Sequence, residues 1–262
     1  MAIVYSVQMN KGGVGKSSLV TNIAAALNLT YPGKKILILD TDGQGNASIA
    51  FNHNPNTMQN TLYDCLVDGI NPAKVIINLR DNLDLLPAND DMNYLEFDVL
   101  TNLEKYPDPF ALLSPIVNEL RNKYDYIFID SPPSMGLIAG NILTATDKVI
   151  LPFMPETFSV QGLMKVIKII HEFQEERKVN AAIGGVVGMM IDGRSSLHSD
   201  LVLQARVYCE KNDIRMFKTR IPRTVRFANA TAAYGLPAVL SDKNSEMVKV
   251  YFDLMKEVIN ID

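Results

Sequence analysis

Glycines and lysines gather near the N-terminus, in the segment from Gln8 to Ser18, with a spacing that suits phosphate binding. A phosphate is held when several backbone N–H groups point at it and the chain passes close by, which only residues without a Cβ allow. Gly12, Gly13 and Gly15 supply such positions. We therefore predict a phosphate-binding loop, whose nucleotide-binding residues are Lys11, Gly12, Gly13, Val14, Gly15, Lys16, Ser17 and Ser18.

The segments on either side of this loop fit the same role. The apolar run from Ile3 to Val7 is of strand type, and the residues from about Lys16 to Leu27 have apolar side chains at helical spacing. The start of this helix would point its free N–H groups and the positive end of its dipole at the phosphate. Lys16 would reach the β and γ phosphates as a point charge, and the Ser17 hydroxyl would bind Mg²⁺.

A second lysine, Lys11, distinguishes this loop from the common phosphate-loop pattern. The pattern G-x-x-x-x-G-K-[ST] requires a glycine where Asn10 stands, whereas the variant x-K-G-G-x-G-K-[ST] is matched in full. Lys11 either adds a second cation beside one triphosphate or reaches the nucleotide of a second subunit. The alternative is a glycine-rich turn with a solvated lysine, which the flanking strand and helix disfavour.

Carboxylates follow two of the predicted strands. Asp40 and Asp42 come after the apolar run Ile36–Leu39, and Asp130 ends the run that begins at Tyr124. Because α/β sheets bind ligands at the carboxyl ends of their strands, we expect these acids beside the loop. Asp40 and Asp42 are spaced to share one face of an extended chain, which suggests a role in positioning metal or water. The alternative is a loop of turn-forming residues. Asp130 would hold Mg²⁺ through water.

Length and composition favour one globular domain. The chain has 262 residues, of which 47% are hydrophobic and 21% charged, so we expect a single domain spanning residues 1–262. No apolar run is long enough for a membrane span and the N-terminus does not read as a signal peptide, so we expect a cytoplasmic protein. Cys65 and Cys209 lack metal-ligand spacing and are expected to be buried apolar residues.

Basic residues are concentrated in one part of an otherwise acidic chain. The formal net charge is −4, which gives no general attraction to nucleic acid. From Arg206 to Arg226, however, seven basic residues stand against two acidic ones, Glu210 and Asp213. A basic run is most often a solvated face, so this cluster alone would not establish DNA binding.

Predicted strands and helices alternate along the whole chain. This order indicates an α/β fold with a mostly parallel sheet and helices on both faces, of the phosphate-loop NTPase type. Further strands are predicted at Val75–Ile77, Leu83–Pro87, Lys148–Phe153 and Ile183–Met190. Further helices are predicted at Leu62–Val67, Tyr94–Leu103, Phe110–Asn122, Ser159–Arg177, Leu201–Glu210, Phe227–Ala233 and Glu246–Ile259.

Four motifs in this order resemble the ParA family of partitioning ATPases, in the deviant Walker A class that also contains MinD and the nitrogenase iron protein. They are Lys11–Ser18, Asp40–Ala47, Asp125–Ser134, and Ile221–Arg226 followed by Tyr234–Pro237. The resemblance spans nearly the whole chain. The sequence departs from the commoner family pattern at Ser17 and Ser18, where two threonines are usual, and at Gly43, where proline is usual.

The resemblance implies a role for each matched residue. Lys11 would be the signature lysine that crosses a dimer interface to the partner's ATP, and Lys16 the phosphate-loop lysine. Asp42 would orient the attacking water, so the implied catalytic residues are Lys11, Lys16 and Asp42. Asp40 and Asp130 would sit around Mg²⁺ beyond its direct ligands. Pro222 and Thr224 match positions that line an adenine pocket.

Features missing from this chain separate it from other members of the class. Neither cysteine is suitably placed to bind a metal cluster, which the iron protein would require. The last helix ends in Asp262 and is not basic, so we expect it to cover the core rather than lie on a membrane. The phosphate loop begins at residue 10, which leaves no room for a preceding helix-turn-helix domain. The sequence is thus similar to the short, Soj-like form.

The expected function follows from this resemblance. An ATP-bound homodimer would bind DNA without sequence preference, associate with the nucleoid, and be released when a ParB-like centromere-binding protein stimulates hydrolysis, with ATP and Mg²⁺ as cofactors and no membrane as partner. Arg220 and Arg223 flank the nucleotide residues. The expected DNA contacts are therefore Arg206, Arg215, Lys218 and Arg226. The alternatives are a metabolic enzyme that phosphorylates or activates a small substrate and a MinD-like membrane-surface ATPase.

Overall fold

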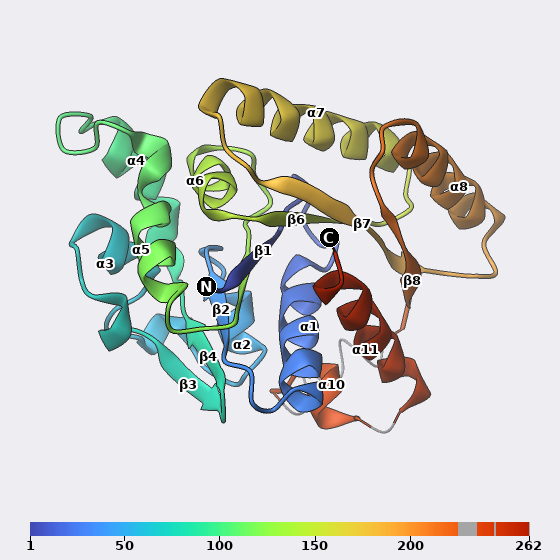
Figure 1. Cartoon of the computed structure of the whole chain (residues 1–262), viewed down its shortest axis with the longest axis horizontal. Helices are drawn as coiled ribbons and strands as arrows, with labels where there is room; N and C mark the ends of the chain where they lie inside the picture. The colour runs from blue at the N-terminus through green and yellow to red at the C-terminus, as the bar shows by residue number, and fades with distance from the viewer. Residues whose placement is uncertain (225–234, 244, 262) are drawn as a thin grey trace.

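An eight-stranded sheet runs through the centre of the structure, a computed structural model that describes residues 1–224, 235–243 and 245–261. The strand order is β3-β4-β2-β5-β1-β6-β7-β8 (Figure 1). Neighbouring strands are parallel except β3, which runs antiparallel to β4. The strands are β1 (Ile3–Val7), β2 (Ile36–Asp40), β3 (Ile77–Arg80), β4 (Leu83–Leu86), β5 (Tyr126–Asp130), β6 (Lys148–Phe153), β7 (Ala182–Ile191) and β8 (Met216–Pro222).

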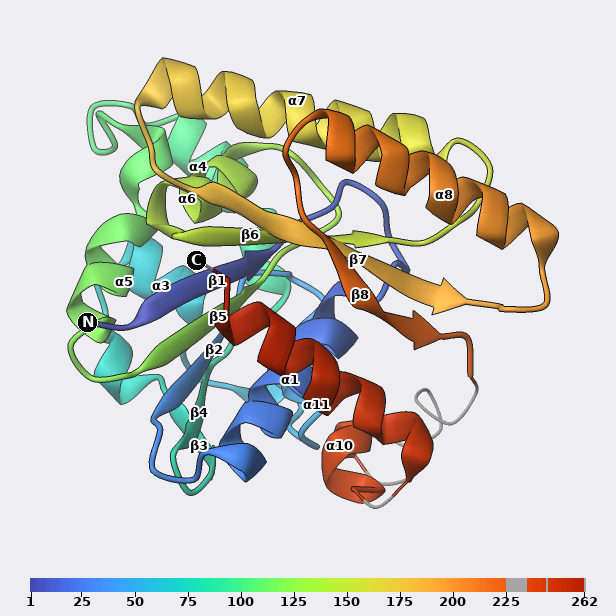
Figure 2. The same ribbon diagram turned by 45° about the vertical axis from the view of Figure 1, so that its right-hand side comes forward.

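Helices cover both faces of this sheet (Figures 1 and 2). One face carries α1 (Lys16–Thr30), α10 (Ala238–Ser241) and α11 (Glu246–Ile259). The other face carries α3 (Leu62–Val67), α4 (Leu95–Leu100), α5 (Leu113–Leu120), α6 (Leu137–Ala145), α7 (Ser159–Arg177) and α8 (Ser196–Lys211). The four-residue helix α2 (Asn46–Ile49) follows β2. The predicted α/β fold is confirmed.

The central strands are apolar because both of their faces are covered. Successive residues of a strand point to opposite faces, so Tyr5 and Phe128 lie in the core under α1 and α11, with their rings stacked at 5.3 Å between centroids. Val4 and Ile127 lie in the core under α3, α5 and α6. This two-sided burial holds the carboxyl ends of β1, β2 and β5 side by side.

Several predicted boundaries differ from the structure. The strand expected at Val75–Ile77 begins only at Ile77, because residues 72–74 form a 3-10 turn in which Ile76 N–H donates to Pro72 O. The helix expected over Tyr94–Leu103 is the shorter α4. The helix expected from Phe110 to Asn122 splits into a 3-10 helix, η4 (Pro109–Ala111), and α5. The buried Asn141 side chain accepts hydrogen bonds from the N–H groups between them, at 2.7 and 3.1 Å.

The helices α6 and α10 and the strand β8 were absent from the sequence prediction, and the helix predicted at residues 227–233 lies outside the described residues. The final helix α11 covers the core as expected, with Tyr251, Leu254 and Val258 buried against the sheet. Both cysteines are buried, also as expected. No helix among the described residues is both long and apolar enough to cross a membrane.

Candidate phosphate-binding site

The loop between β1 and α1 lines a cavity of about 450 Å³ at the carboxyl edge of the sheet. Gly13 and Gly15 have φ angles of 73° and 88°, in the left-handed region that favours glycine. A Cβ on Gly15 would also lie 2.9 Å from Met189 Cε. The φ angle of Gly12 is not in this region, and a Cβ added to Gly12 would lie 4.0 Å from its nearest neighbour, Pro133 Cβ. Two of the three predicted glycines are therefore required by backbone geometry, and the third keeps the cavity open.

The N-terminus of α1 faces this cavity without a side-chain cap from any described residue. Its first N–H groups therefore remain available to an anion, which the helix dipole also favours. Lys16 is buried, and its Nζ donates to Lys11 O at 3.2 Å, so the side chain folds back over the loop. Burial lowers the pKa of Lys16, while the charges of Asp130 and Asp42 oppose that change. The loop thus places a cation and free N–H groups in one cavity.

The carboxylates of Asp40 and Asp130 end neighbouring strands, where the two residues are paired in register. Asp40 is fully buried, and its oxygens accept the N–H groups of Asp42 at 3.0 Å and Ala47 at 3.1 Å. Burial, followed by the charge of Asp130, raises the pKa of Asp40 well above its usual value. Asp40 therefore fixes the turn that carries Asp42, which itself lines the cavity and accepts Gln44 N–H at 3.1 Å.

Asp130 differs from Asp40 because neither of its carboxylate oxygens accepts a hydrogen bond of standard geometry from a described residue, although the Ser17 hydroxyl and the Ser131 N–H are close enough to act on its charge. It is fully buried, and burial raises its pKa to about 7. The Ser17 hydroxyl, Lys16 and the Ser131 N–H oppose this rise, and the charge of Asp42 adds to it. A buried carboxylate with only such weak contacts is costly unless a cation neutralises it. Carboxylate and hydroxyl oxygens are hard ligands that suit Mg²⁺, so Asp130 and Ser17 fit that ion.

No cluster of three or more His, Cys, Asp or Glu side chains that could hold a metal occurs among the described residues.

A second cavity, of about 880 Å³, adjoins the first and shares Gly15 and Ser18 with it. Pro222 and Thr224, singled out in the sequence, line this second cavity. Residues that the sequence analysis missed line it too, chiefly Met189, Ile191 and Tyr251. The Tyr251 hydroxyl lies 3.3 Å from Ser18 Oγ, which ties α11 to the phosphate loop. A tyrosine on the buried stripe of a final helix was the only sequence signal for this contact.

Lys11 and Val14 are the two predicted loop residues that do not line the phosphate cavity. Both line a neighbouring cavity of about 170 Å³, together with Met154 and Phe158. The Val14 side chain is buried, whereas that of Lys11 is partly exposed. Lys11 Nζ lies 2.5 Å from Glu156 Oε2, and the side chains are 40% and 52% exposed. The structure therefore brings the phosphate-loop residues and the three acids together but turns Lys11 outward.

Three of the four predicted DNA contacts lie on or beside β8, the edge strand of the sheet (Figure 2). Arg206 is a half-buried residue of α8, Lys218 is an exposed residue of β8, and Arg215 is exposed just before that strand. Arg226 lies outside the described residues. At the same edge, Glu257 of α11 accepts the N–H groups of residues 218 and 219, at 2.8 and 2.9 Å. This contact covers part of the strand edge and leaves the side chains of Arg215 and Lys218 exposed.

Comparisons with known proteins agree with this site. A family model described as an AAA domain matches residues 2–183. The sporulation initiation inhibitor protein Soj of Bacillus subtilis is 32% identical, over 98% of each chain. The chromosome partitioning protein ParA of Caulobacter vibrioides is 30% identical, over 98% of this chain and 94% of its own.

The fold is also similar to that of cobyrinic acid a,c-diamide synthase from Mycobacterium smegmatis, solved with an ATP analog and magnesium. The TM-score is 0.83 at 25% identity, covering 98% of this chain and 93% of that one.

Proposed function

We propose that this chain, which belongs to the ParA family of partitioning ATPases, binds Mg²⁺·ATP in the phosphate cavity and couples its hydrolysis to the segregation of DNA. The observation that carries the chemistry is Asp130, a buried carboxylate that accepts no hydrogen bond of standard geometry from a described residue, next to the cavity that Lys16 and Ser17 line. The full-length similarity to chromosome partitioning ParA carries the assignment of the process.

Each residue of the cavity has a role in this proposal. The backbone N–H groups of residues 12–18 and the Lys16 ammonium bind the phosphates. The Ser17 hydroxyl and Asp130 hold Mg²⁺, the latter through water, and the ion supplies charge neutralisation at the phosphates. Asp42 positions the attacking water. Asp40 lies beside Asp130 but has both oxygens engaged by loop N–H groups, so it would act by holding Asp42 in place.

The second cavity takes the base and sugar of the nucleotide in this proposal. It shares Gly15 and Ser18 with the phosphate cavity and is lined by Pro222, Thr224 and apolar residues of β7. A mostly apolar cavity with a few polar groups is the usual setting for a small ligand or cofactor.

A second subunit completes the site. Lys11 points away from its own cavity and is paired with Glu156 on the surface. Exposed ion pairs contribute only about 0–1 kcal/mol, so Lys11 can exchange Glu156 for the phosphates of a second copy at little cost. ATP binding therefore favours a homodimer in which each Lys11 contacts the partner's nucleotide.

The dimer binds DNA through the basic residues at the β8 edge, and it is found on the nucleoid in the cytoplasm. Arg206, Arg215 and Lys218, with Arg226, would contact phosphates without reading bases. A ParB-like centromere-binding protein stimulates hydrolysis and so releases the dimer.

The metabolic and membrane-surface alternatives are not favoured. The structural similarity to the diamide synthase is at 25% identity, whereas Soj and ParA match this chain at 32% and 30% over nearly its full length. The final helix, which a membrane-surface relative would use as an anchor, has its apolar stripe buried on the core.

Substitution of the water-positioning acid tests the proposal directly. Asp42→Ala should abolish ATP turnover yet retain Mg²⁺·ATP binding and give a long-lived dimer, because Asp42 is assigned to the water and not to the metal. Phosphate release, nucleotide binding and sedimentation with ATP are the measurements. Turnover by Asp42→Ala at the wild-type rate would show the assignment to be wrong.

A further inference from the structure

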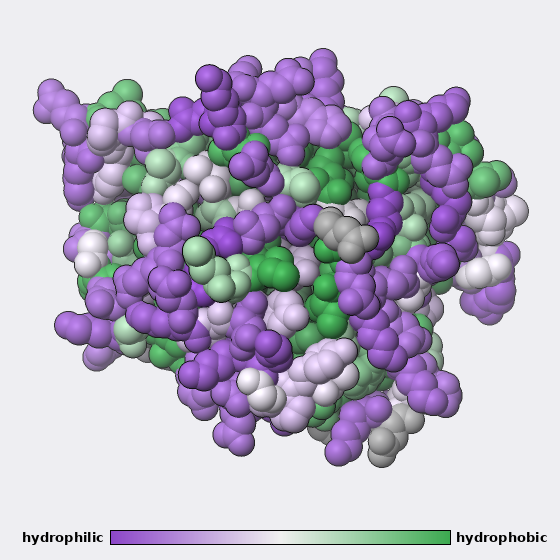
Figure 3. Space-filling model, viewed as in Figure 1, coloured by the Kyte–Doolittle hydropathy of each residue, from purple (hydrophilic) through white to green (hydrophobic). Residues whose placement is uncertain are grey.

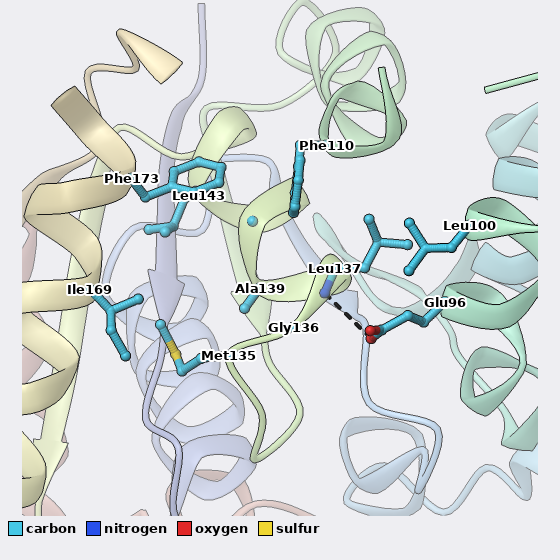
Figure 4. A pocket seen from close by; sticks show the side chains of 11 residues that line it. Glu96, Leu100, Phe110, Met135, Gly136, Leu137, Ala139, Leu143, Ile169 and Phe173 are labelled. Atoms are coloured by element: carbon cyan, nitrogen blue, oxygen red, sulfur yellow. Dashed lines mark hydrogen bonds between the residues drawn. The ribbon is translucent and has the colours of Figure 1, made fainter. Parts of the chain in front are cut away.

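An apolar cavity of about 260 Å³ lies between α4, α6 and α7, away from the residues that line the phosphate cavity. Figure 4 shows Leu100 of α4 on one side, Phe173 of α7 on the other, and Leu137 between them. Phe110 and Phe173 meet edge to face at 5.6 Å between ring centroids. Among the described residues that line the cavity, Glu96 alone carries a charge.

Large apolar side chains continue from this cavity onto the surface of α4 and its flanks. Tyr94 is 62% exposed, Phe97 70%, Leu100 47% and Leu103 53%. Figure 3 shows hydrophobic surface among hydrophilic side chains at this corner, on the upper left. Single exposed apolar residues are ordinary, but several together beside a cavity are typical of an interaction site. We call Tyr94, Glu96, Phe97, Leu100, Leu103 and the cavity beside them the α4 surface.

The segment that carries the α4 surface is acidic. Residues 90–108 contain six acidic side chains and one basic one, Lys105. Arg177 of α7 is paired with one of these acids, Asp108, and lies over the Phe110 ring, so the remaining acids of the segment outnumber the bases around it. Lys105 is engaged with the carbonyl of Val67, to which its Nζ donates at 2.9 Å. Glu96 Oε2 accepts the N–H of Leu137 at only 3.5 Å, the weak limit for such a bond. An acidic, apolar surface repels nucleic acid and anionic membranes and attracts a segment that is both basic and apolar.

The chain segment after β5 joins the α4 surface to the candidate nucleotide site. Pro133 lines the phosphate cavity, and Met135, Gly136 and Leu137 line the α4 cavity. A Cβ on Gly136 would lie 2.8 Å from Glu96 Oε2, so the carboxylate and this segment are in close contact. Movement of Glu96 therefore acts directly on the segment that begins at Asp130.

We propose that the α4 surface is the docking site for a positively charged amphipathic segment of a partner protein. Apolar side chains of that segment enter the cavity and cover Phe97, and a lysine or arginine draws Glu96 away from Leu137. The release of Leu137 shifts residues 131–137 and so alters nucleotide hydrolysis. The link to hydrolysis rests on the proposed ATPase function, whereas the docking itself does not.

Two synthetic peptides test the docking. One has leucines at helical spacing and lysines elsewhere, and its match has glutamate for every lysine. Fluorescence anisotropy should show binding of the lysine peptide only. Phe97→Ser and Glu96→Gln should each weaken that binding about tenfold, as expected for residues at the centre of an interface. Leu203→Ser on α8, where Leu203 is 60% exposed, is the matched control and should change nothing. Equal affinities for all three variants would overturn the proposal.

Hydrolysis measurements separate this inference from the proposed function. Wild type should hydrolyse ATP without peptide, and the lysine peptide should change that rate in wild type and Leu203→Ser but not in Phe97→Ser. A wild type without ATPase activity would refute the proposed function and leave the docking result standing. Binding without any change in rate would overturn the link through residues 131–137. Sedimentation without peptide tests whether a second copy of the chain occupies the surface instead. Self-association of wild type that is lost in Phe97→Ser would show that it does, and would overturn the proposal.

Discussion

Asp130 is a fully buried carboxylate whose surroundings compensate its charge only in part. Lys16, the Ser17 hydroxyl and the Ser131 N–H favour the ionised form, but burial outweighs them, so ionisation destabilises the nucleotide-free protein. With its pKa raised to about 7, the folded state binds this proton more tightly than the unfolded chain does. The contribution of this proton to stability is therefore fully present below about pH 4 and is lost as pH rises through about 7.

Asp130→Asn should therefore stabilise the nucleotide-free protein, and by more at pH 8 than at pH 5. The expected gain at pH 8 is on the order of a few kcal/mol, because each unit of pKa shift corresponds to about 1.4 kcal/mol. Thermal unfolding of both proteins over a pH series measures it. The same variant should lose the extra stability that Mg²⁺ with ATP gives to wild type. An identical melting temperature at pH 8 would contradict this account of Asp130.

Lys11 can be separated from its surface partner by two substitutions. Lys11→Ala should lose the ATP-dependent dimer while the monomer still binds nucleotide through Lys16. Glu156→Gln should keep the dimer, with an affinity within about fivefold of wild type, since an exposed pair contributes at most about 1 kcal/mol. Sizing with and without ATP decides between the possibilities. A dimer formed by Lys11→Ala would return Lys11 to the role of a solvated surface lysine.

At the scale of elements, the contact between α6 and η4 depends on a glycine. A Cβ on Gly140 would lie 2.3 Å from Phe110 Cδ1, and also 3.0 Å from Phe173. Gly→Ala in a helix ordinarily stabilises by about 1 kcal/mol, but here the aromatic pair must move. We expect Gly140→Ala to destabilise the protein by about 1–3 kcal/mol, as overpacking does.

Gly162 in α7 provides the matched control, because nothing lies within 4 Å of the Cβ that alanine would add there. Gly162→Ala should stabilise by roughly 0.5–1 kcal/mol, the ordinary helix effect. Chemical denaturation of both variants gives the two free energies of unfolding. Effects of the same sign in both would mean that the Phe110 and Phe173 rings yield easily.

The elements that the sequence predicted well are those with a strong local signal. The buried strands β1, β2, β5 and β6 are continuous apolar runs, and α7 and α11 keep helical spacing over many residues. β8 was missed because it is an edge strand with Lys218 and Arg220 exposed, so its composition resembles a basic loop. α6 was missed because glycines interrupt its pattern and a Pro-Pro pair precedes it.

The candidate site was predictable in composition but not in connectivity. The sequence was enough to place the phosphate loop and the three acids at one edge of the sheet, because the carboxyl ends of parallel strands meet there. The sequence could not tell that both Asp40 oxygens accept hydrogen bonds of standard geometry while those of Asp130 accept none from a described residue, nor that Lys11 turns toward Glu156. The Asp40 contacts are local, but they depend on how the chain turns after β2. The Lys11–Glu156 pair joins residues 145 positions apart, which no local pattern reveals.

At the scale of the whole molecule, opposite charges are held at opposite ends of the sheet. The acidic α4 surface lies toward the end of the sheet formed by β3, β4, β2 and β5. The basic residues lie at the other end, at the β8 edge, and β8 is far from α4 in both ribbon views (Figures 1 and 2). A partner at α4 and DNA at β8 would therefore not compete for the same surface. The −4 net charge of the chain makes any DNA affinity of one subunit weak.

Dimerisation should be what switches DNA binding on. Few cations on an acidic monomer give affinities on the order of 10⁻⁴ M or weaker at physiological salt. A dimer brings two such surfaces onto one duplex, which raises affinity through effective concentration without new contacts. We expect DNA binding that requires ATP, ignores sequence and falls steeply with salt. Arg206, Arg215 and Lys218 of two subunits correspond to a log–log salt slope of about −5.

Arg215→Glu and Lys218→Glu should each abolish this binding and preserve the ATP dimer, because they remove two phosphate contacts per dimer and add repulsion. Lys168→Glu on α7 makes the same charge change away from the β8 edge, at a lysine that is paired with Glu172 of the same helix. This control variant should bind DNA nearly as well as wild type does. Arg226→Glu, outside the described residues, belongs in the same series. Mobility-shift titrations with unrelated duplexes, carried out with ATP or ADP over a salt series, test each part.

Equal DNA binding with ADP and ATP would contradict the ATP-dependent switch. An equal loss of DNA binding in Lys168→Glu would mean that overall charge, and not the β8 edge, controls DNA binding.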